Sequence, residues 1–324
     1  MSGDFEGVIL AGGRGSRMAP FSERYPKPLL PIGNRPLIEH QIEMMRALGI
    51  LEITILIGHK GFELACVLGD GQRLGVRIQY VEQTTVLGIA HAVGCLEKYV
   101  QKPFLLFLGD IFFVQDDIGE MLRLYTQQDG GAVLATKFEA DPAAIRKNFS
   151  LKINDEGLVT RVIEKPRHIT SKLKGVGIYL FDLTIFDAIR RTPRTAMRDE
   201  YEITDSIQVM IQDGYTVRAS NCILDDMNLT TPADLLACNV ALAKQVGTGE
   251  QVLGPNLKAH PNVEIVNSVI GANVTIPYPI RIENSLVFPD TTVSAQSGFE
   301  GHIVTPELHL DCNTAQITSR VQWA

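Results

Sequence analysis

The chain has 324 residues, a formal net charge of −7 at pH 7, and a composition that is 45% hydrophobic and 21% charged. This length is too great for one small core and predicts one large domain with a smaller one. The acidic balance argues against nucleic acid and anionic membranes as partners, because both attract basic patches.

No stretch approaches the roughly 18 apolar residues of a membrane span, and the N-terminus lacks the pattern of a signal peptide. The cysteines are widely spread and form no CxxC pair; they stand at positions 66, 95, 222, 238 and 312. We therefore expect reduced thiols in a cytoplasmic protein, with neither a disulfide framework nor a zinc site.

In the first half of the chain, short apolar runs alternate with helical patterns. The runs predict buried strands over 7–11, 53–58, 76–81 and 104–109. Helices are expected between and after them, over 36–49, 88–100 and 116–128. Strands that alternate with helices at this spacing predict an α/β fold around a mainly parallel sheet.

The middle of the chain is richer in strands, which are predicted over 131–138, 149–153, 158–165 and 175–182. The segment NDEG (154–157) predicts a turn between two of them. Helical patterns return over 201–214 and 232–244, on either side of a strand-like segment at 215–224. These additions predict a mixed sheet.

The pattern changes beyond about residue 250. Ile270, Ile276 and Ile282 are six residues apart, and NSVIGANV (267–274) is echoed by NSLVFPDT (284–291), seventeen residues later. Aliphatic residues at period six are typical of a parallel β-helix built of hexapeptide coils, here expected to be short and left-handed.

A few unrelated edge strands are the alternative reading of this segment. With the β-helix reading, the chain has two domains: an α/β domain over residues 1–245, and a β-helix with a tail over residues 246–324.

The segment LAGGRGSRM (10–18) follows the first predicted strand. It is not a dinucleotide-binding fingerprint, because Met18 stands where the third glycine belongs, which argues against a NAD-dependent dehydrogenase. The Gly-Lys-Ser/Thr of a P-loop is also missing. What remains is either a structural turn or a loop whose backbone N–H groups face an anion, to which Arg14, Arg17 and Lys27 add charge.

Two further segments place charged residues at the ends of predicted strands. Asp110 follows the strand 104–109, where ligands bind in open α/β sheets, and a carboxylate there is a natural Mg²⁺ ligand. EKP (164–166) would bind sugar hydroxyls and a phosphate. For both segments the alternative is an ordinary solvated turn.

Taken in this order, the segments resemble the sugar-1-phosphate nucleotidylyltransferases. The resemblance covers roughly residues 7–240. Within the family, the chain is most similar to the long forms of glucose-1-phosphate thymidylyltransferase. The resemblance implies a Rossmann-like sheet of the nucleotide-diphospho-sugar transferase type. Its segments are LAGGRGSRM, PKPLLPIGNRPLIEH (26–40), QTTVLGIAHAV (83–93), FLLFLGD (104–110), VIEKP, GVGIYLFD, EYEITDSIQ (200–208) and TPADLLACN (231–239).

The resemblance also implies roles for individual residues. Arg17 would bind the β- and γ-phosphates, Lys27 the α-phosphate, and Asp110 a Mg²⁺ ion. The sugar and its phosphate would contact Glu164, Lys165 and Gly177. The nucleotide would contact Leu10, Ala11, Gly12, Gly13, Arg14, Gly15, Ser16, Gln83 and Gly88, with Gln83 at the pyrimidine edge; Arg14 is otherwise a solvated loop tip.

The sequence departs from the family pattern at two positions. Asn228 stands where the family often has a second metal-binding carboxylate, so that an amide oxygen would bind the metal, and Asp225 and Asp226 lie near enough in sequence to compensate. Ser150 replaces a glycine that is usual in the sugar site. These departures leave the identity of the sugar open.

The implied reaction joins a nucleoside triphosphate to a sugar 1-phosphate and releases pyrophosphate, with Mg²⁺ as cofactor. The expected substrates are dTTP or UTP and glucose 1-phosphate. Another sugar, such as N-acetylglucosamine 1-phosphate with UTP, is one alternative; a catalytically silent regulatory or scaffold relative is the other. A homo-oligomer is expected.

Overall fold

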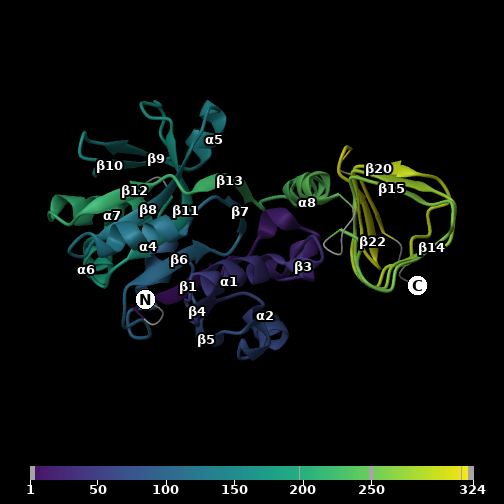
Figure 1. Cartoon of the computed structure of the whole chain (residues 1–324), viewed down its shortest axis with the longest axis horizontal. Coiled ribbons are helices and arrows are strands. Elements are labelled where there is room, and N and C mark those ends of the chain that lie inside the picture. Colours follow the sequence, from purple (N-terminus) through teal and green to yellow (C-terminus); the bar gives the residue numbers. More distant parts are fainter. Residues whose placement is uncertain (1–3, 197, 248–251, 315, 320–324) are drawn as a thin grey trace. The chain divides into compact units, whose positions relative to one another are not determined.

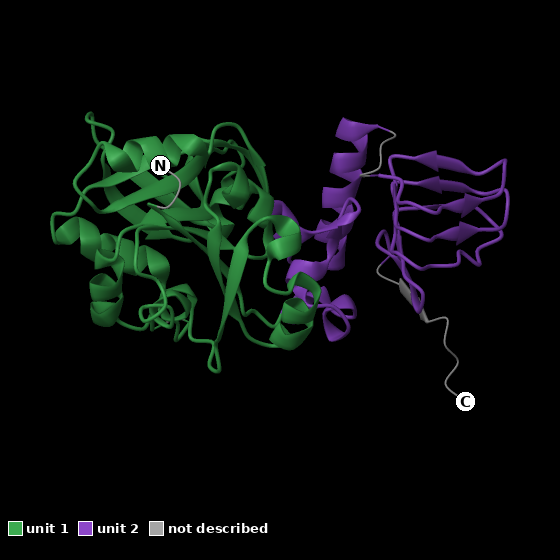
Figure 2. Cartoon of the chain, turned by 60° about the horizontal axis from the view of Figure 1, so that its bottom comes forward, with its two compact units in different colours: residues 1–14, 41–226 green, residues 15–40, 227–324 purple. Residues whose placement is uncertain are grey.

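The computed structural model describes residues 4–196, 198–247, 252–314 and 316–319. The chain divides into two compact units, each assembled from two stretches of sequence (Figure 2). Unit 1 comprises residues 1–14 and 41–226, and unit 2 comprises residues 15–40 and 227–324. The sequence boundary after residue 245 lies inside unit 2, so the division into domains 1–245 and 246–324 stays a prediction.

Unit 1 is built on a nine-stranded sheet (Figure 1). The four strands predicted in the first half of the chain are β1 (Glu6–Ala11), β4 (Glu52–Ile57), β5 (Arg77–Glu82) and β6 (Phe104–Leu108). They are parallel, in the spatial order β5-β4-β1-β6. The chain therefore moves outward from β1 to β4 and β5, and then returns to the other side of β1 with β6. Such a reversal is the switch point at which open α/β sheets bind ligands, beyond the carboxyl ends of the strands.

The remaining strands make the sheet mixed, as predicted. They are β8 (Ala132–Phe138), β9 (Phe149–Ile153), β10 (Val159–Glu164), β11 (Leu173–Phe181) and β12 (Val217–Ser220). β11 runs antiparallel to β6, β8 and β9, whereas β12 is parallel to β8. A separate two-stranded sheet pairs β7 (Ile111–Gln115) with β13 (Ile223–Asn228).

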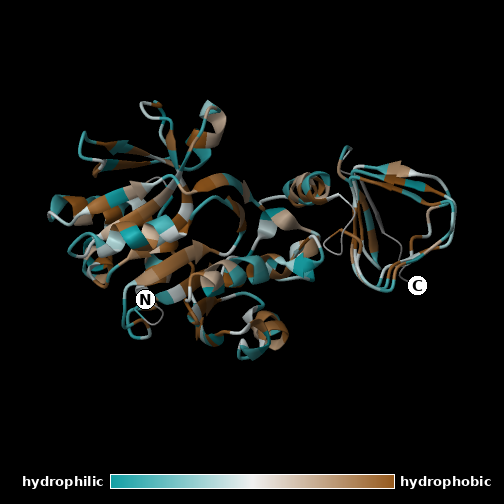
Figure 3. Ribbon diagram, in the orientation of Figure 1, coloured by the Kyte–Doolittle hydropathy of each residue, from teal (hydrophilic) through white to brown (hydrophobic). Residues whose placement is uncertain are grey.

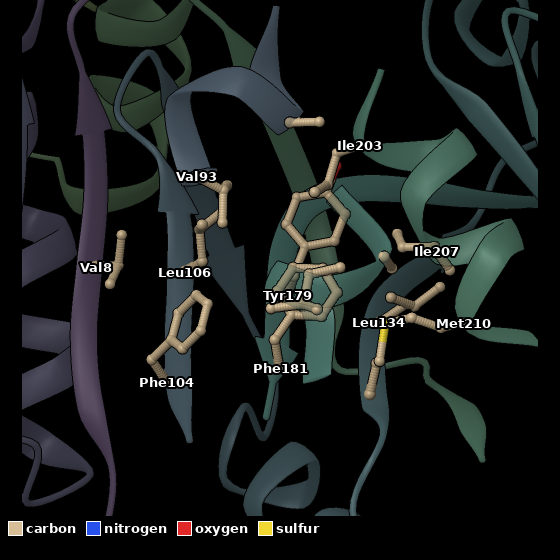
Figure 4. Packing of buried hydrophobic residues seen from close by; sticks show 14 of the residues in the cluster. Val8, Val93, Phe104, Leu106, Leu134, Tyr179, Phe181, Ile203, Ile207 and Met210 are labelled. Atoms are coloured by element: carbon tan, nitrogen blue, oxygen red, sulfur yellow. The ribbon is translucent and has the colours of Figure 1, made fainter. Parts of the chain in front are cut away.

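The core of unit 1 lies where one face of the sheet meets helices (Figure 4). Phe104 and Leu106 on β6 point to the same side as Tyr179 and Phe181 on β11, because side chains two residues apart share a face. The rings of Tyr179 and Phe181 stack at 5.5 Å between centroids. The helix α7 (Ile203–Gln212) closes this layer with Ile203, Ile207 and Met210. Each such buried side chain contributes about 1.5–3 kcal/mol.

The other helices are short and amphipathic, and the apolar residues gather on the strands and on the buried helix faces (Figure 3). On α1, Leu37, Ile38, Ile42 and Met45 are at most 1% exposed. α1 crosses from unit 2 into unit 1. The helices are α1 (Leu37–Ala47), α2 (Gly61–Leu68), α3 (Ile89–Gly94), α4 (Gly119–Thr126), α5 (Pro142–Lys147) and α6 (Thr184–Arg191).

Unit 2 joins the segment 15–40 to the C-terminal part of the chain. The segment consists of the 3-10 turns η1 (Ser16–Met18), η2 (Phe21–Glu23) and η3 (Lys27–Leu29), followed by the hairpin β2 (Pro31–Ile32) and β3 (Arg35–Pro36). It is fixed to α8 (Pro232–Val246) through buried Asn239. The Asn239 Oδ1 accepts from the Gly33 N–H at 2.8 Å, and its Nδ2 donates to the Pro31 carbonyl at 2.9 Å.

From Val252 onward the chain forms the predicted parallel β-helix. Successive coils pair in parallel with an offset of 17 residues, as Val269 does with Leu286 and Leu286 with Ile303. Ile270, Ile276 and Ile282 are fully buried inside it, so the reading as unrelated edge strands is wrong. The handedness stays a prediction.

The coils contribute short strands to three sheets. One sheet contains β14 (Lys258–Ala259) and β17 (Thr275–Ile276), and another contains β15 (Glu264–Val266), β18 (Arg281–Glu283) and β20 (Phe299–Glu300). The third contains β16 (Val269–Ile270), β19 (Leu286–Val287), β21 (His302–Val304), β22 (Leu308–Asp311) and β23 (Gln316–Ser319). β22 and β23 run antiparallel and end the stack of coils.

One predicted helix is shorter than expected. The segment 88–100 is helical only as α3, which ends at Gly94, a residue that disfavours helix continuation; turns follow it. The predicted turn at 154–157 is confirmed by the hydrogen bond from the Gly157 N–H to the Asn154 carbonyl. None of the five cysteines, all of which lie in the described part of the chain, forms a disulfide. None of the described helices has the length and apolar character needed to cross a membrane.

Candidate active site

The carboxyl ends of the parallel strands gather predicted site residues at one edge of the sheet in unit 1. The glycine loop follows β1, Gln83 follows β5, and Asp110 follows β6. The Gly109 N–H donates to the Leu10 carbonyl at 2.9 Å, which joins the turn that carries Asp110 to the start of the glycine loop. Leu10 and Asp110 therefore lie at the switch point of the sheet.

A buried glutamine on α1 fixes the same turn from the other side. The Gln41 Nε2 donates to the carbonyls of Leu108 at 2.9 Å and Ile111 at 2.8 Å. These carbonyls flank Gly109 and Asp110, and Gln41 is only 1% exposed. A side chain that holds both ends of a turn restricts the conformations of the residues between them.

Gln83 lies against the backbone of Gly12, two residues after Leu10 in the glycine loop. A methyl group on Gly12 would come within 2.9 Å of the Gln83 Oε1. The Gln83 Nε2 is 3.2 Å from the His91 Nδ1, within hydrogen-bond distance. Gly88 begins α3 and packs against the backbone of Tyr201. The predicted base-binding residues Gly12, Gln83 and Gly88 are thus held by local contacts.

Gly177 lies in a bulge of β11, where the register with β8 shifts between Gly175 and Tyr179. Its φ of 82° is in the left-handed region that favours glycine. A methyl group there would lie 2.8 Å from the Ile111 Cδ1 and 2.9 Å from the Leu108 Cδ1. Gly177 therefore packs directly against the two residues that flank the Gly109–Asp110 turn.

A charged cluster follows β10. The Arg198 Nη1 lies 2.7 Å from the Glu202 Oε1 and 3.4 Å from the Glu164 Oε1, and Lys165 Nζ lies 3.8 Å from that same Glu164 oxygen. Burial and the neighbouring Glu202 carboxylate raise the pKa of Glu164, and burial raises the pKa of Glu202. Lys165 adopts a φ of 41°, which is strained for a residue with a side chain.

Sequence reasoning missed Gln41 and Arg198. Gln41 belongs to the quoted helix 36–49, but the sequence does not tell which turn its side chain reaches. Arg198 lies two residues before the start of the quoted segment EYEITDSIQ (200–208) and contacts Glu164, a predicted sugar contact. The position of an arginine beside a quoted motif was the signal available.

The predicted phosphate-binding residues Arg17 and Lys27 belong to unit 2. Gly15 precedes η1, which contains exposed Arg17. A methyl group on Gly15 would lie 3.5 Å from the Lys27 Cδ, so the glycine packs on the aliphatic stem of the lysine. Ser16 is exposed in η1. In unit 1, Ala11 is buried at the end of β1, whereas Gly13 and Arg14 are exposed.

Asp225 and Asp226, the carboxylates near Asn228 in sequence, contact lysines, while Asn228 ends β13 in unit 2. Both Asp226 oxygens bind the Lys174 Nζ, at 2.6 and 2.8 Å, and the Lys137 Nζ lies 2.5 Å from Asp225. Burial raises the pKa of Asp226, against the attraction of the two ammonium groups. These carboxylates are therefore engaged by lysines.

A single fixed carboxylate fits a magnesium ion. Among the described residues, no three His, Cys, Asp or Glu side chains form a group that could hold a metal. Magnesium usually takes one or two carboxylates and completes its coordination with water and substrate phosphates. Asp110, on a turn fixed by hydrogen bonds to Gly109, Leu108 and Ile111, suits that mode of binding.

The fold and this arrangement define an α/β protein with a glycine-rich loop and a carboxylate on a fixed turn at the switch point of its sheet. Residues 6–239 match the nucleotidyl transferase family. The chain belongs to this family.

Two relatives are nucleotide-transferring enzymes by name. The low-salt glycan biosynthesis nucleotidyltransferase Agl11 of Haloferax volcanii is 37% identical over 215 residues, which are 65% of this chain and 58% of that protein. A glucose-1-phosphate thymidylyltransferase of Streptomyces griseus is 33% identical over 216 residues, 66% of this chain and 59% of that protein. The chain thus spans about three fifths of the length of both relatives.

The fold is also similar to that of a solved protein. A Bacillus anthracis protein assigned as a glucose-1-phosphate thymidylyltransferase superposes with a TM-score of 0.66 and is 32% identical. The alignment covers 76% of this chain and 98% of the other. The α/β architecture expected from the sequence is therefore confirmed.

Proposed function

We propose that this chain transfers a nucleotidyl group from a nucleoside triphosphate to a sugar 1-phosphate and releases pyrophosphate. The observation that carries the proposal is the Asp110 turn, which is hydrogen-bonded to the glycine loop at Leu10 and sits at the switch point of the sheet. The activity in the names of the Streptomyces griseus and Bacillus anthracis relatives supports dTTP with glucose 1-phosphate as substrates, and UTP stays the second nucleotide expected from the sequence.

In this reaction the sugar phosphate oxygen attacks the α-phosphorus in line, and pyrophosphate leaves on the opposite side. Such a displacement depends on positioning and charge neutralisation more than on covalent help. Arg17 neutralises the departing β- and γ-phosphates, and Lys27 binds the α-phosphate. Asp110, together with the Asn228 amide, would hold Mg²⁺, which would supply positive charge to neutralise the phosphates.

Glu164 and Lys165 bind the sugar ring and its phosphate, with Gly177 close to the sugar. The backbone from Leu10 to Ser16 surrounds the nucleotide, and Arg14 adds charge to it. Gln83 offers both a donor and an acceptor to a pyrimidine edge, with Gly88 beneath the base or ribose.

The sugar is the less determined substrate. Ser150, in the place of a usual glycine, is 1% exposed in β9. N-acetylglucosamine 1-phosphate with UTP is therefore the alternative pair. We further propose that the protein works in the cytoplasm as a homo-oligomer.

The direct test is pyrophosphate release from a panel of nucleoside triphosphates and sugar 1-phosphates, with and without Mg²⁺. Arg17→Ala and Asp110→Ala should each lower the rate at least about 100-fold without unfolding the protein. Arg123→Ala, an exposed arginine paired with Asp117, is the matched control and should keep full activity. Near-normal rates in either site variant would contradict the proposal.

The same panel separates a catalytically silent relative, which the Asn228 departure motivates. Such a protein would bind a nucleoside diphosphate sugar, measured by calorimetry, and release no pyrophosphate from any substrate pair.

A further inference from the structure

The coils of the β-helix differ at one corner, which is occupied by Gly254, Gly271 and Phe288 in successive coils, 17 residues apart. The stacking of the coils requires the two glycines. A methyl group on Gly254 would lie 2.5 Å from the backbone nitrogen of Ala272, and one on Gly271 would lie 2.4 Å from that of Pro289. After the third coil the chain turns back as the antiparallel strand β22, so a large side chain has room at this corner.

The ring of Phe288 packs on the N-terminal segment of the same unit. It stacks on Phe21 with 5.7 Å between the centroids, and Tyr25 lies 5.5 Å from it. Phe21 is 1% exposed and Phe288 is 3% exposed, so these rings exclude water from the contact. Aromatic pairs of this kind contribute beyond the area that they bury.

A second departure from the repeat faces the same segment. Glu307 occupies the repeat position of Asn256, Asn273 and Asp290, and its carboxylate forms an ion pair with Arg24. Both partners are partly exposed, so the pair orients the contact more than it strengthens it. The two residues that break the repeat therefore meet one short stretch, residues 21–25.

This stretch lies between the two cations of the proposed phosphate site. Arg17 stands in η1, four residues before Phe21, and Lys27 begins η3, two residues after Tyr25. The loop is built of 3-10 turns, which make few internal hydrogen bonds, so its shape depends on what it packs against. Phe21 is the buried side chain of this loop that Phe288 covers.

We propose that Phe288 and Glu307 are positioning residues for nucleotide binding: the third coil of the β-helix and the segment that follows it hold the loop that presents Arg17 and Lys27 to the triphosphate. On this proposal the β-helix contributes to nucleotide binding, because it fixes the position of this loop. The inference rests on the proposed function for the roles of Arg17 and Lys27.

The test compares two phenylalanines of the third coil in the full chain. Phe288→Ala removes the contact with the loop, whereas Phe299→Ala removes a ring that packs on His302 and His309. In Phe288→Ala we expect amide hydrogen exchange over residues 15–30 to rise about tenfold and the KM for the nucleoside triphosphate to rise about tenfold, with the KM for the sugar 1-phosphate unchanged.

Phe299→Ala should leave the exchange of residues 15–30 and both KM values as in the wild type. Phe288→Tyr keeps the ring, so its exchange over residues 15–30 and its two KM values should match those of the wild type. Glu307→Gln, a mild change for the case that Phe288→Ala fails to fold, should raise exchange over the same residues about twofold.

Exchange over residues 15–30 that is unchanged in Phe288→Ala, or equally changed in Phe299→Ala, overturns the inference. Hydrogen exchange requires no substrate. If the wild type releases no pyrophosphate from any substrate pair, the proposed function fails, while the exchange comparison still decides whether the third coil holds the loop.

Discussion

The buried amide of Gln41 stabilises a turn, although its own hydrogen-bonding capacity is not fully used. Its Nε2 donates to two carbonyls around Asp110, whereas its Oε1 is buried and has no hydrogen-bond partner in the described part of the chain. A buried acceptor without a partner costs roughly 1–3 kcal/mol. The clamp on the turn is therefore retained at a cost in stability, as at other sites where function constrains the fold.

We expect Gln41→Met to raise the Mg²⁺ concentration needed for half-maximal pyrophosphate release about tenfold, because a loosened Asp110 turn binds the ion less well. Methionine keeps the volume and removes the donors. Gln128→Met is the matched control, since the Gln128 Nε2 donates to the Gly130 carbonyl at 2.9 Å and its Oε1 also lacks a partner among the described residues.

A Mg²⁺ titration of both variants, beside their thermal midpoints, checks this prediction. Gln128→Met should lose stability without a change in the titration. In an Asp110→Asn background, Gln41→Met should add nothing to the Mg²⁺ requirement. Equal titration curves for the two glutamine variants would contradict the role assigned to Gln41.

Glu164 makes a second residue-scale prediction, about pH. Burial raises its pKa in the folded protein, so ionisation opposes folding; its contribution favours the fold below the ordinary pKa and is lost as the pH rises through the raised value. Glu164→Gln should therefore increase the free energy of unfolding at pH 8 by about 0.5–1 kcal/mol and change it little at pH 4, while activity falls.

Urea unfolding at the two pH values measures this difference. Glu156→Gln, a change at an exposed carboxylate in the turn between β9 and β10, is the control for the loss of one surface charge. A Glu164→Gln protein that is less stable at pH 8 than the wild type would show that the ionised carboxylate supports the fold.

At the scale of secondary-structure elements, Gly177 in the bulge of β11 combines a left-handed backbone with close packing. A comparison with Gly157 separates these two requirements. Gly177 has a φ of 82° and close neighbours, whereas Gly157, in a turn, has a φ of 76° and no atom within 4 Å of an added methyl group. Gly157→Ala should cost about 1–2 kcal/mol for the left-handed backbone alone. Gly177→Ala should cost roughly 1–3 kcal/mol more, because Leu108 and Ile111 must move.

Urea unfolding of the two alanine variants gives both costs. Equal costs would mean that the side chains around Gly177 yield freely and that the bulge does not fix the neighbouring turn.

The elements that sequence reasoning located are those with a strong pattern of their own. The apolar runs of the central strands and the isoleucines of the β-helix are repeated often enough to stand out. The helices α2, α5 and α6 have at most eight residues each and were missed, whereas the equally short α3 and α4 lie within longer segments that show a helical pattern, 88–100 and 116–128.

The same distinction holds for the candidate site: residues with a local sequence pattern could be predicted, and those without one could not. The glycine loop and Asp110 could be predicted as site residues because both follow apolar runs that predict strands. Gln41 and the contact between Phe21 and Phe288 depend on where side chains point and on chain segments more than 60 residues apart, which no local pattern records.

At the scale of the whole molecule, the chain passes between the two units after residues 14, 40 and 226. The second passage lies inside α1 and the third inside β13, so each unit owns part of an element that continues into the other. Unfolding either unit would break a helix and a strand of its neighbour. Elements shared in this way favour a single cooperative transition over two independent ones.

Two buried cysteines can report on this cooperativity. Cys222 in unit 1 is 2% exposed and Cys238 in unit 2 is fully buried, and burial raises the pKa of Cys222 to about 11, which further suppresses its thiolate. In a Cys66→Ser background, which removes an exposed thiol, we expect both to be protected in the native protein and to become labelled at the same urea concentration. Labelling sites are read by mass spectrometry of peptides. Separate midpoints for Cys222 and Cys238 would show that the units unfold independently despite the elements that they share.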